Sequence, residues 1–239
     1  MAVYACGDLH GHREIYDKIC EILKPGDKVF CVGDCCDRGP QSWETVQAVY
    51  NDPRFVYLRG NHEDMLVKAC EDYLDTGTWQ YDSYRLGKMN GGEDTMDSWE
   101  RDPLRETWYH RLRKLPTWDT YENENGVVII LSHAGFTPWL VEGTYDECSI
   151  PDDDTLLWDR EHFLDEYDSA EMDNVIIVHG HTPSHYLSVD LWKDWEGGAF
   201  WYCDGHKVCI DSGGFFSGEF VLLNLDTLED IVLTLDKTS

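Results

Sequence analysis

Apolar and polar positions follow a regular order through residues 2–75, where a short apolar run, a glycine-rich polar loop and a segment of helical apolar spacing occur three times. The apolar runs cover residues 3–6, 28–32 and 55–58, and helices are expected at about 13–23, 41–50 and 65–74. Strands that alternate with helices predict parallel βαβ units, whose right-handed crossovers bring all three loops to one edge of a sheet.

The rest of the chain shows a different order. Residues 76–118 are irregular and then helical, which predicts a helical side layer. Apolar runs at 126–131 and 174–178 each end in a turn with glycine and histidine, and runs at 207–210, 220–225 and 231–235 predict an antiparallel meander. The expected fold class is α/β, with a two-sheet β-sandwich core and βαβ units flanked by helices, in a single domain over residues 1–239.

An aromatic insertion at about 190–206 contains three tryptophans, Phe200 and Tyr202 around the pair Gly197-Gly198. It could form a lid that selects substrate or a hairpin packed on the helices. The hairpin is favoured here.

Composition limits the class of protein. A chain of 239 residues with 42% apolar content can bury a sizeable core, and no apolar segment approaches the roughly 20 residues that cross a membrane. The start of the chain reads as a first strand and not as a signal peptide. Nine cysteines without a Cys-x-x-Cys pair indicate reduced thiols. A cytoplasmic protein with no membrane partner is therefore expected. The expected oligomeric state is a monomer or a weak oligomer.

The formal net charge is −28, and the acidic residues are spread along the whole chain. Nucleic-acid binding needs clustered lysine and arginine, and the sequence has no basic stripe, so no nucleic-acid partner is expected. Adaptation to high salt would give the same composition, and the sequence does not separate these readings.

Six polar residues follow the ends of predicted strands, and their side chains are potential metal ligands. They are Asp8, His10, Asp34, Asn61, His133 and His181. Mixed nitrogen and oxygen donors suit Zn, Fe or Mn, and six ligands are too many for one catalytic zinc. Two metals that share the carboxylate of Asp34, from the middle strand, fit this set better. His179 competes with His181 for one place, because residues two apart on a strand share a face.

Several motifs together resemble a known family. They are Gly7-Asp8-Leu9-His10-Gly11, Gly33-Asp34 through Asp37-Arg38-Gly39, Gly60-Asn61-His62-Glu63, Asn90-Gly91-Gly92, His133, Trp158-Asp159-Arg160-Glu161, Gly180-His181-Thr182-Pro183 and Ile210-Asp211-Ser212-Gly213. In this order they look like the phosphoprotein phosphatase family of the metallophosphoesterase superfamily, above all its bacteriophage lambda type of serine/threonine protein phosphatase. The resemblance implies a calcineurin-like metallophosphoesterase fold.

The resemblance also implies roles for single residues. Asp8, His10 and Asp34 would hold one metal, and Asp34, Asn61, His133 and His181 the other. His62 would act as the general acid with Asp37 as its orienting partner, and Arg38, Arg59 and Arg160 would bind phosphate oxygens. The cofactors would be two divalent metal ions, with Mn²⁺ expected and Fe or Zn as alternatives.

The implied activity is that of a phosphoric monoester hydrolase. It would hydrolyse phosphoserine and phosphothreonine in phosphoproteins, or small phosphate esters, by in-line attack of a metal-bound hydroxide. A symmetrical bis(5'-nucleosyl)-tetraphosphate hydrolase is the alternative within the superfamily, and a noncatalytic metal-binding module is the alternative outside it. Cys35 and Cys36 are interpreted as small fillers of a tight loop and not as metal ligands.

Overall fold

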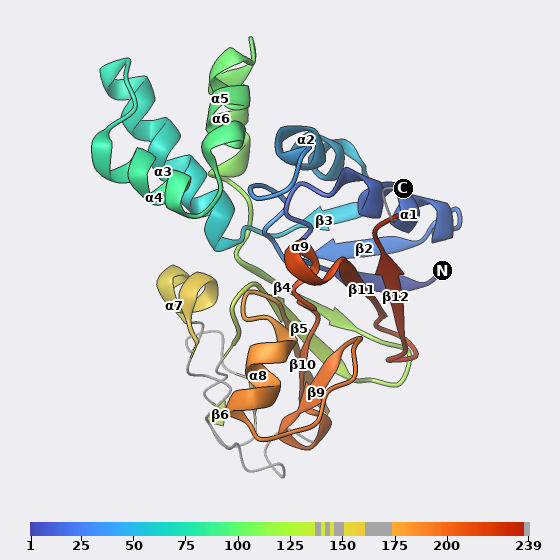
Figure 1. Cartoon of the computed structure of the whole chain (residues 1–239). Coiled ribbons are helices and arrows are strands. Elements are labelled where there is room, and N and C mark those ends of the chain that lie inside the picture. The colour runs from blue at the N-terminus through green and yellow to red at the C-terminus, as the bar shows by residue number, and fades with distance from the viewer. Residues whose placement is uncertain (137–139, 142–143, 146–150, 161–173, 237–239) are drawn as a thin grey trace.

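A computed structural model gives the fold of the chain (Figure 1). It describes residues 1–136, 140–141, 144–145, 151–160 and 174–236. Two five-stranded mixed sheets pack against each other and are flanked by helices, which confirms the expected fold class. Within the described ranges, no helix is both long and apolar enough to cross a membrane.

The first sheet contains the three predicted parallel strands. Its order is β12 (Asp230–Thr234), β11 (Glu219–Asn224), β1 (Val3–Cys6), β2 (Lys28–Cys31) and β3 (Phe55–Tyr57). β1, β2 and β3 pair in parallel, and α1 (Arg13–Ile22) and α2 (Ser42–Asn51) connect them, as the βαβ pattern predicts. The chain then enters α3 (Asn61–Thr76), so the carboxyl ends of all three strands open at the same edge.

The second sheet has the order β4 (Trp118–Glu122), β5 (Val128–Ser132), β8 (Val175–His179), β10 (Lys207–Cys209) and β9 (Phe200–Tyr202). β5 and β8 are parallel, and β9 and β10 form an antiparallel pair joined by the 3-10 helix Cys203–Gly205. β6 (Leu140–Val141) and β7 (Thr144–Tyr145) form a separate two-stranded antiparallel sheet.

The predicted meander of the last three strands is wrong in one respect. β10 pairs in parallel with β8 in the second sheet, and only β11 and β12 form an antiparallel pair in the first. The short helix α9 (Gly214–Ser217) lies between β10 and β11, and left-handed glycines flank it at Gly213 and Gly218. These turns carry the chain from one sheet to the other, which apolar spacing alone does not reveal.

Alternating side chains on each strand divide the core into two layers. In β1, Val3 and Ala5 face the second sheet and meet residues such as Ile129 and Val178, whereas Cys6 packs beneath the helices. The helical layer includes α4 (Tyr81–Met89), α5 (Glu93–Arg101) and α6 (Arg105–Leu112), and Figure 1 shows these helices beside α3 on one side of the molecule. The period of two along each strand thus fixes which side chains reach the sandwich and which reach the helices.

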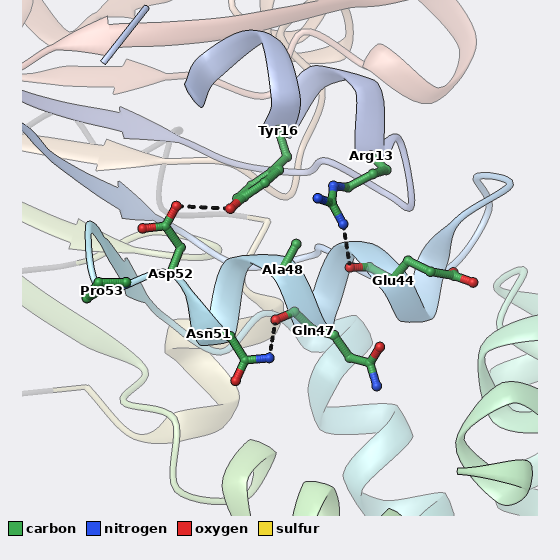
Figure 2. A pocket seen from close by; sticks show the side chains of 8 residues that line it. All are labelled: Arg13, Tyr16, Glu44, Gln47, Ala48, Asn51, Asp52 and Pro53. Atoms are coloured by element: carbon green, nitrogen blue, oxygen red, sulfur yellow. Dashed lines mark hydrogen bonds between the residues drawn. The ribbon is translucent and has the colours of Figure 1, made fainter. Parts of the chain in front are cut away.

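A surface cavity of about 600 Å³ lies along α1 and α2 (Figure 2). Two hydrogen bonds join residues that line it: the Tyr16 hydroxyl donates to the Asp52 carboxylate at 2.9 Å, and the Arg13 guanidinium donates to the backbone carbonyl of Glu44 at 3.5 Å. No residue of the predicted site lines this cavity.

Candidate metal centre and active site

The six predicted ligand side chains converge where the carboxyl ends of the two sheets meet. Asp8 and His10 follow β1, Asp34 follows β2, Asn61 begins α3 after β3, His133 follows β5, and His181 follows β8. All six are buried, with at most 6% of the residue exposed. Charged and imidazole side chains are seldom buried together without a common ligand.

Asp34 lies at the centre of this cluster. Its Oδ2 atom is 3.8 Å from Nε2 of His10, and its Oδ1 atom is 3.4 Å from Nε2 of His133. Two groups could each hold a cation, His10 with Asp34 and His62, and Asp8 with Asp34 and His133, and Asp34 belongs to both. This position suits a carboxylate that is shared between two ions.

The environment of Asn61 also fits a cation. His133 has Nδ1 3.0 Å from the Val32 carbonyl, so Nδ1 carries the proton and Nε2 keeps its lone pair. That Nε2 lies 2.8 Å from Oδ1 of Asn61, and Nδ1 of His181 lies 3.0 Å from the same oxygen. Burial lowers the pKa of His133 to about 4 and lowers that of His181 as well, so both rings are neutral near pH 7. Neutral imidazoles and an amide oxygen are ligands that divalent metals accept.

The surroundings of Asp8 also favour a bound cation. Its Oδ1 accepts a hydrogen bond from the backbone N–H of His181 at 3.1 Å, but its buried Oδ2 has no hydrogen-bond partner among the described residues. Burial, together with the carboxylates of Asp211 and Asp34, raises the pKa of Asp8 well above its ordinary value. A divalent cation would satisfy this oxygen and offset the repulsion, so the residues present fit a metal pair.

His62 and Asp37 form the predicted pair. Nδ1 of His62 lies 2.7 Å from Oδ2 of Asp37, and Thr95 of α5 donates to the other oxygen of Asp37 at 2.7 Å. Burial lowers the pKa of His62, but the Asp34 and Asp37 carboxylates outweigh it and leave the pKa above its ordinary value. The ring is thereby fixed, and its Nε2 points toward the cluster, 3.8 Å from Oδ2 of Asp34.

The three predicted arginines are placed differently. The guanidinium of Arg38 lies 2.7 Å from Nε2 of His10 and 3.0 Å from Nε2 of His62, so it is at the centre. Arg59 instead donates to Asp153 of α7 (Asp153–Trp158) at 3.0 Å. Arg160 is exposed, and its charge helps to lower the pKa of His181, whereas Glu161, the last residue of its motif, lies outside the described residues. Of the three, Arg38 is the one held directly against the cluster.

Backbone strain is concentrated at the same residues. Ten non-glycine residues of the described chain have positive φ, and six of them belong to the predicted site: Asp8, His10, Asp34, Asp37, Arg38 and His181. Left-handed backbone costs an ordinary residue about 1 kcal/mol or more, and it persists where surrounding contacts over-determine it. Such strain is typical of functional sites.

Glu63 is the positioning residue that the sequence interpretation missed. It is fully buried, and its carboxylate accepts hydrogen bonds from the backbone N–H groups of Asp34, Cys35 and Gly60 at 2.8, 2.8 and 2.9 Å. It therefore fixes the loop that carries Asp34. A glutamate three residues after the N-cap of a helix, here Gly60, is a known capping pattern, and this spacing could have identified it.

The fold and this buried cluster define a class of enzyme. The family model for the calcineurin-like phosphoesterases matches residues 1–207, and the chain belongs to this family. Its members bind a dinuclear centre of divalent metals, so the chain is a metal-dependent phosphoesterase.

The chain is also similar in sequence to curated proteins of this family. The chain is 33% identical over 144 residues to a symmetrical bis(5'-nucleosyl)-tetraphosphatase of Azotobacter vinelandii, a match that covers 58% of this chain and 45% of the relative. It is 32% identical over 148 residues to the enzyme of that name from Pseudomonas syringae pv. tomato, covering 59% of this chain and 43% of the relative. The matches thus span less than half the length of these relatives.

Solved structures share the fold. A protein assigned as a diadenosine tetraphosphatase superposes with a TM-score of 0.60 at 16% identity, covering 98% of this chain and 94% of that one. A cold-active protein-tyrosine phosphatase of a psychrophilic Shewanella species superposes with a TM-score of 0.57 at 16% identity, covering 97% and 77%.

The expectation of a lambda-type phosphatase for phosphoserine and phosphothreonine is wrong, because the curated relatives are named tetraphosphatases. The physical reason is that the motifs used for this expectation belong to the buried cluster and not to a surface that distinguishes substrates. Asp37-Arg38 and Gly60-Asn61-His62-Glu63 contribute side chains to the buried cluster, and a phosphate presents the same chemistry whether a protein or a nucleotide carries it. These motifs therefore establish the reaction class and not the substrate.

Proposed function

We propose that the chain hydrolyses bis(5'-nucleosyl) tetraphosphates at the central phosphoanhydride and releases two nucleoside diphosphates. The observation that carries this proposal is the 33% identity over 144 residues to a symmetrical tetraphosphatase. In the reaction, a water oxygen bonds to one inner phosphorus and the bond from that phosphorus to the bridging oxygen breaks. The bridging oxygen leaves with the second nucleoside diphosphate.

The metal-binding roles proposed here follow the clustered side chains. Asp8, His10 and Asp34 would hold one ion, Asp34, Asn61, His133 and His181 would hold the other, and Mn²⁺ is the expected metal. A bound metal pair polarises phosphoryl oxygens and lowers the pKa of water. The neutral state of His133 supports its role as a ligand, and the place of Asp34 in both candidate groups supports Asp34 as the shared ligand.

The remaining polar residues would act on the substrate directly. His62, oriented by its 2.7 Å contact with Asp37, would give a proton to the departing bridging oxygen. Arg38 would bind phosphate oxygens through its planar guanidinium, with Arg59 and Arg160 as further contacts to the tetraphosphate chain. Of the three arginines, Arg38 has its guanidinium against the cluster, 2.7 Å from His10 and 3.0 Å from His62, so a phosphate bound there would lie within its reach.

Product analysis tests the proposal. The purified chain is incubated with diadenosine tetraphosphate and MnCl₂, and the nucleotides are separated by anion exchange. ADP as the sole product is expected, while ATP with AMP, or intact substrate, would overturn the proposal. Asp34→Asn serves as the inactive control, and a phosphoserine peptide tested in parallel shows whether the activity extends to monoesters.

A further inference from the structure

Two phenylalanines lie on the four-residue helix α9, beside the buried cluster of candidate ligand side chains. Phe215 and Phe216 are 40% and 52% exposed, and their rings contact each other at 4.8 Å. A Cβ atom on Gly213, whose φ is 69°, would overlap the ring of Phe216. The glycines around α9 therefore allow a conformation that presents both rings at the surface.

Phe215 contacts the site itself. Its ring lies 5.5 Å from the ring of His10 in an edge-to-face arrangement, and the guanidinium of Arg38 lies 4.3 Å from its centroid. Arg38 in turn reaches both His10 and His62. Any group attached to a phosphate that Arg38 binds is consequently brought close to the exposed part of the Phe215 ring.

The charge of the protein makes an uncharged contact valuable here. The net charge of −28 opposes the approach of a polyanion such as a dinucleoside tetraphosphate. Stacking of a base on an aromatic ring does not depend on charge, and it is sequence-tolerant because every base has a π-face. An inorganic or alkyl phosphate has no base, so it cannot stack on such a ring.

We infer that Phe215 is a stacking platform for a nucleobase of the substrate, and so a residue that sets the preference for nucleoside polyphosphates. This inference rests on the proposed function. The contrasting role would be a purely structural one, in which Phe215 only supports Arg38.

Binding of two matched ligands separates these roles without any turnover. ADP and ribose 5-diphosphate carry the same diphosphate and sugar and differ by the base alone. Titration calorimetry on the Mn-loaded protein is expected to give roughly tenfold tighter binding of ADP, the usual size of one base stack. Phe215→Leu and Phe215→Met should bring the ratio of the two affinities close to one, whereas Phe215→Trp should keep it at about ten.

The ratio of the two affinities is the decisive quantity, because loss of support for Arg38 would weaken the binding of both ligands equally. Equal affinities in the wild type, or a ratio unchanged in Phe215→Leu, would overturn the inference. Trp192→Leu is the control, since that ring is 95% exposed and lies outside α9, and its ratio should match the wild type. If diadenosine tetraphosphate is not hydrolysed while the ADP preference depends on Phe215, the proposed function fails and the platform stands.

Discussion

Oε2 of Glu63 accepts a hydrogen bond from the backbone N–H of Asp34 at 2.8 Å, although the two residues are 29 positions apart. The carboxylate also binds the N–H groups of Cys35 and Gly60 and the hydroxyl of Tyr57. One buried side chain thus holds the loop of Asp34 against the start of α3.

Glu63→Gln should destabilise the fold. The amide has one acceptor oxygen in place of two and directs an NH₂ group at backbone donors, so a loss of about 3 kcal/mol is expected. Urea unfolding measures it. Glu122→Gln, on the exposed edge strand β4, is the control and should change stability by no more than about 0.5 kcal/mol. Equal effects in the two variants would contradict the positioning role of Glu63.

Asp34→Asn should change stability in opposite directions with and without metal. Burial raises the pKa of Asp34, so its ionised form costs stability in the metal-free protein near pH 7. With EDTA present, the variant should therefore melt at a slightly higher temperature than the wild type. Added MnCl₂ should raise the melting temperature of the wild type and leave the variant almost unchanged. A variant that still responds to Mn²⁺ like the wild type would exclude Asp34 as a ligand.

His62→Asn should affect substrates according to their leaving groups. An alkoxide needs a proton in order to leave, so any kcat measurable on glycerol phosphate should fall by about 10² or more. A nucleoside diphosphate leaves as a weaker base, and kcat for diadenosine tetraphosphate should fall by only about tenfold. Asp37→Asn should also lower kcat more for glycerol phosphate than for diadenosine tetraphosphate, but both losses should be smaller than in His62→Asn. Equal losses on both substrates would argue against His62 as the proton donor.

Gly180→Ala should impair metal binding through a steric effect. An added Cβ would overlap Oδ2 of Asp8, the buried oxygen that has no hydrogen-bond partner in the part of the chain that the structure describes. The Kd for Mn²⁺, measured by calorimetry, should rise at least about tenfold. Changes to residues that orient a metal ligand typically weaken metal binding about 10- to 100-fold. At Gly77 a Cβ meets nothing within 4 Å, so Gly77→Ala should cost only about 1 kcal/mol of backbone strain and leave the Kd unchanged.

Asp52 should contribute to stability in a defined pH range. Hydrogen bonds from the Arg54 side chain lead the effects that lower its pKa from 3.8 to about 2. A carboxyl group with a depressed pKa stabilises the fold above its ordinary pKa, and that contribution is lost as the pH falls from about 4 to about 2. Asp52→Asn should therefore cost about 1 kcal/mol at pH 7, after allowance for partial exposure, and almost nothing at pH 2. Urea unfolding at both pH values checks this difference.

The sequence by itself determined the fold class and the positions of the clustered residues. Strand periodicity placed Asp8, Asp34 and His133 directly after apolar runs, and the carboxyl ends of parallel strands meet at one edge for reasons of chain chirality. Local pattern and handedness are enough to predict that the side chains after β1, β2 and β3 converge. His133 and His181 follow strands of the second sheet, and only the packing of the two sheets brings them to the same place. The roles of the six side chains as ligands remain a prediction.

Only the tertiary structure decided how these residues are held and what lies beside them. Thr95 reaches Asp37 across 58 positions, β10 joins the second sheet and not the meander, and Phe215 stands against Arg38. Each depends on contacts between segments far apart in the chain, which spacing along the sequence does not encode. The substrate cannot be predicted from the local motifs either, because a phosphate presents the same chemistry whatever group carries it.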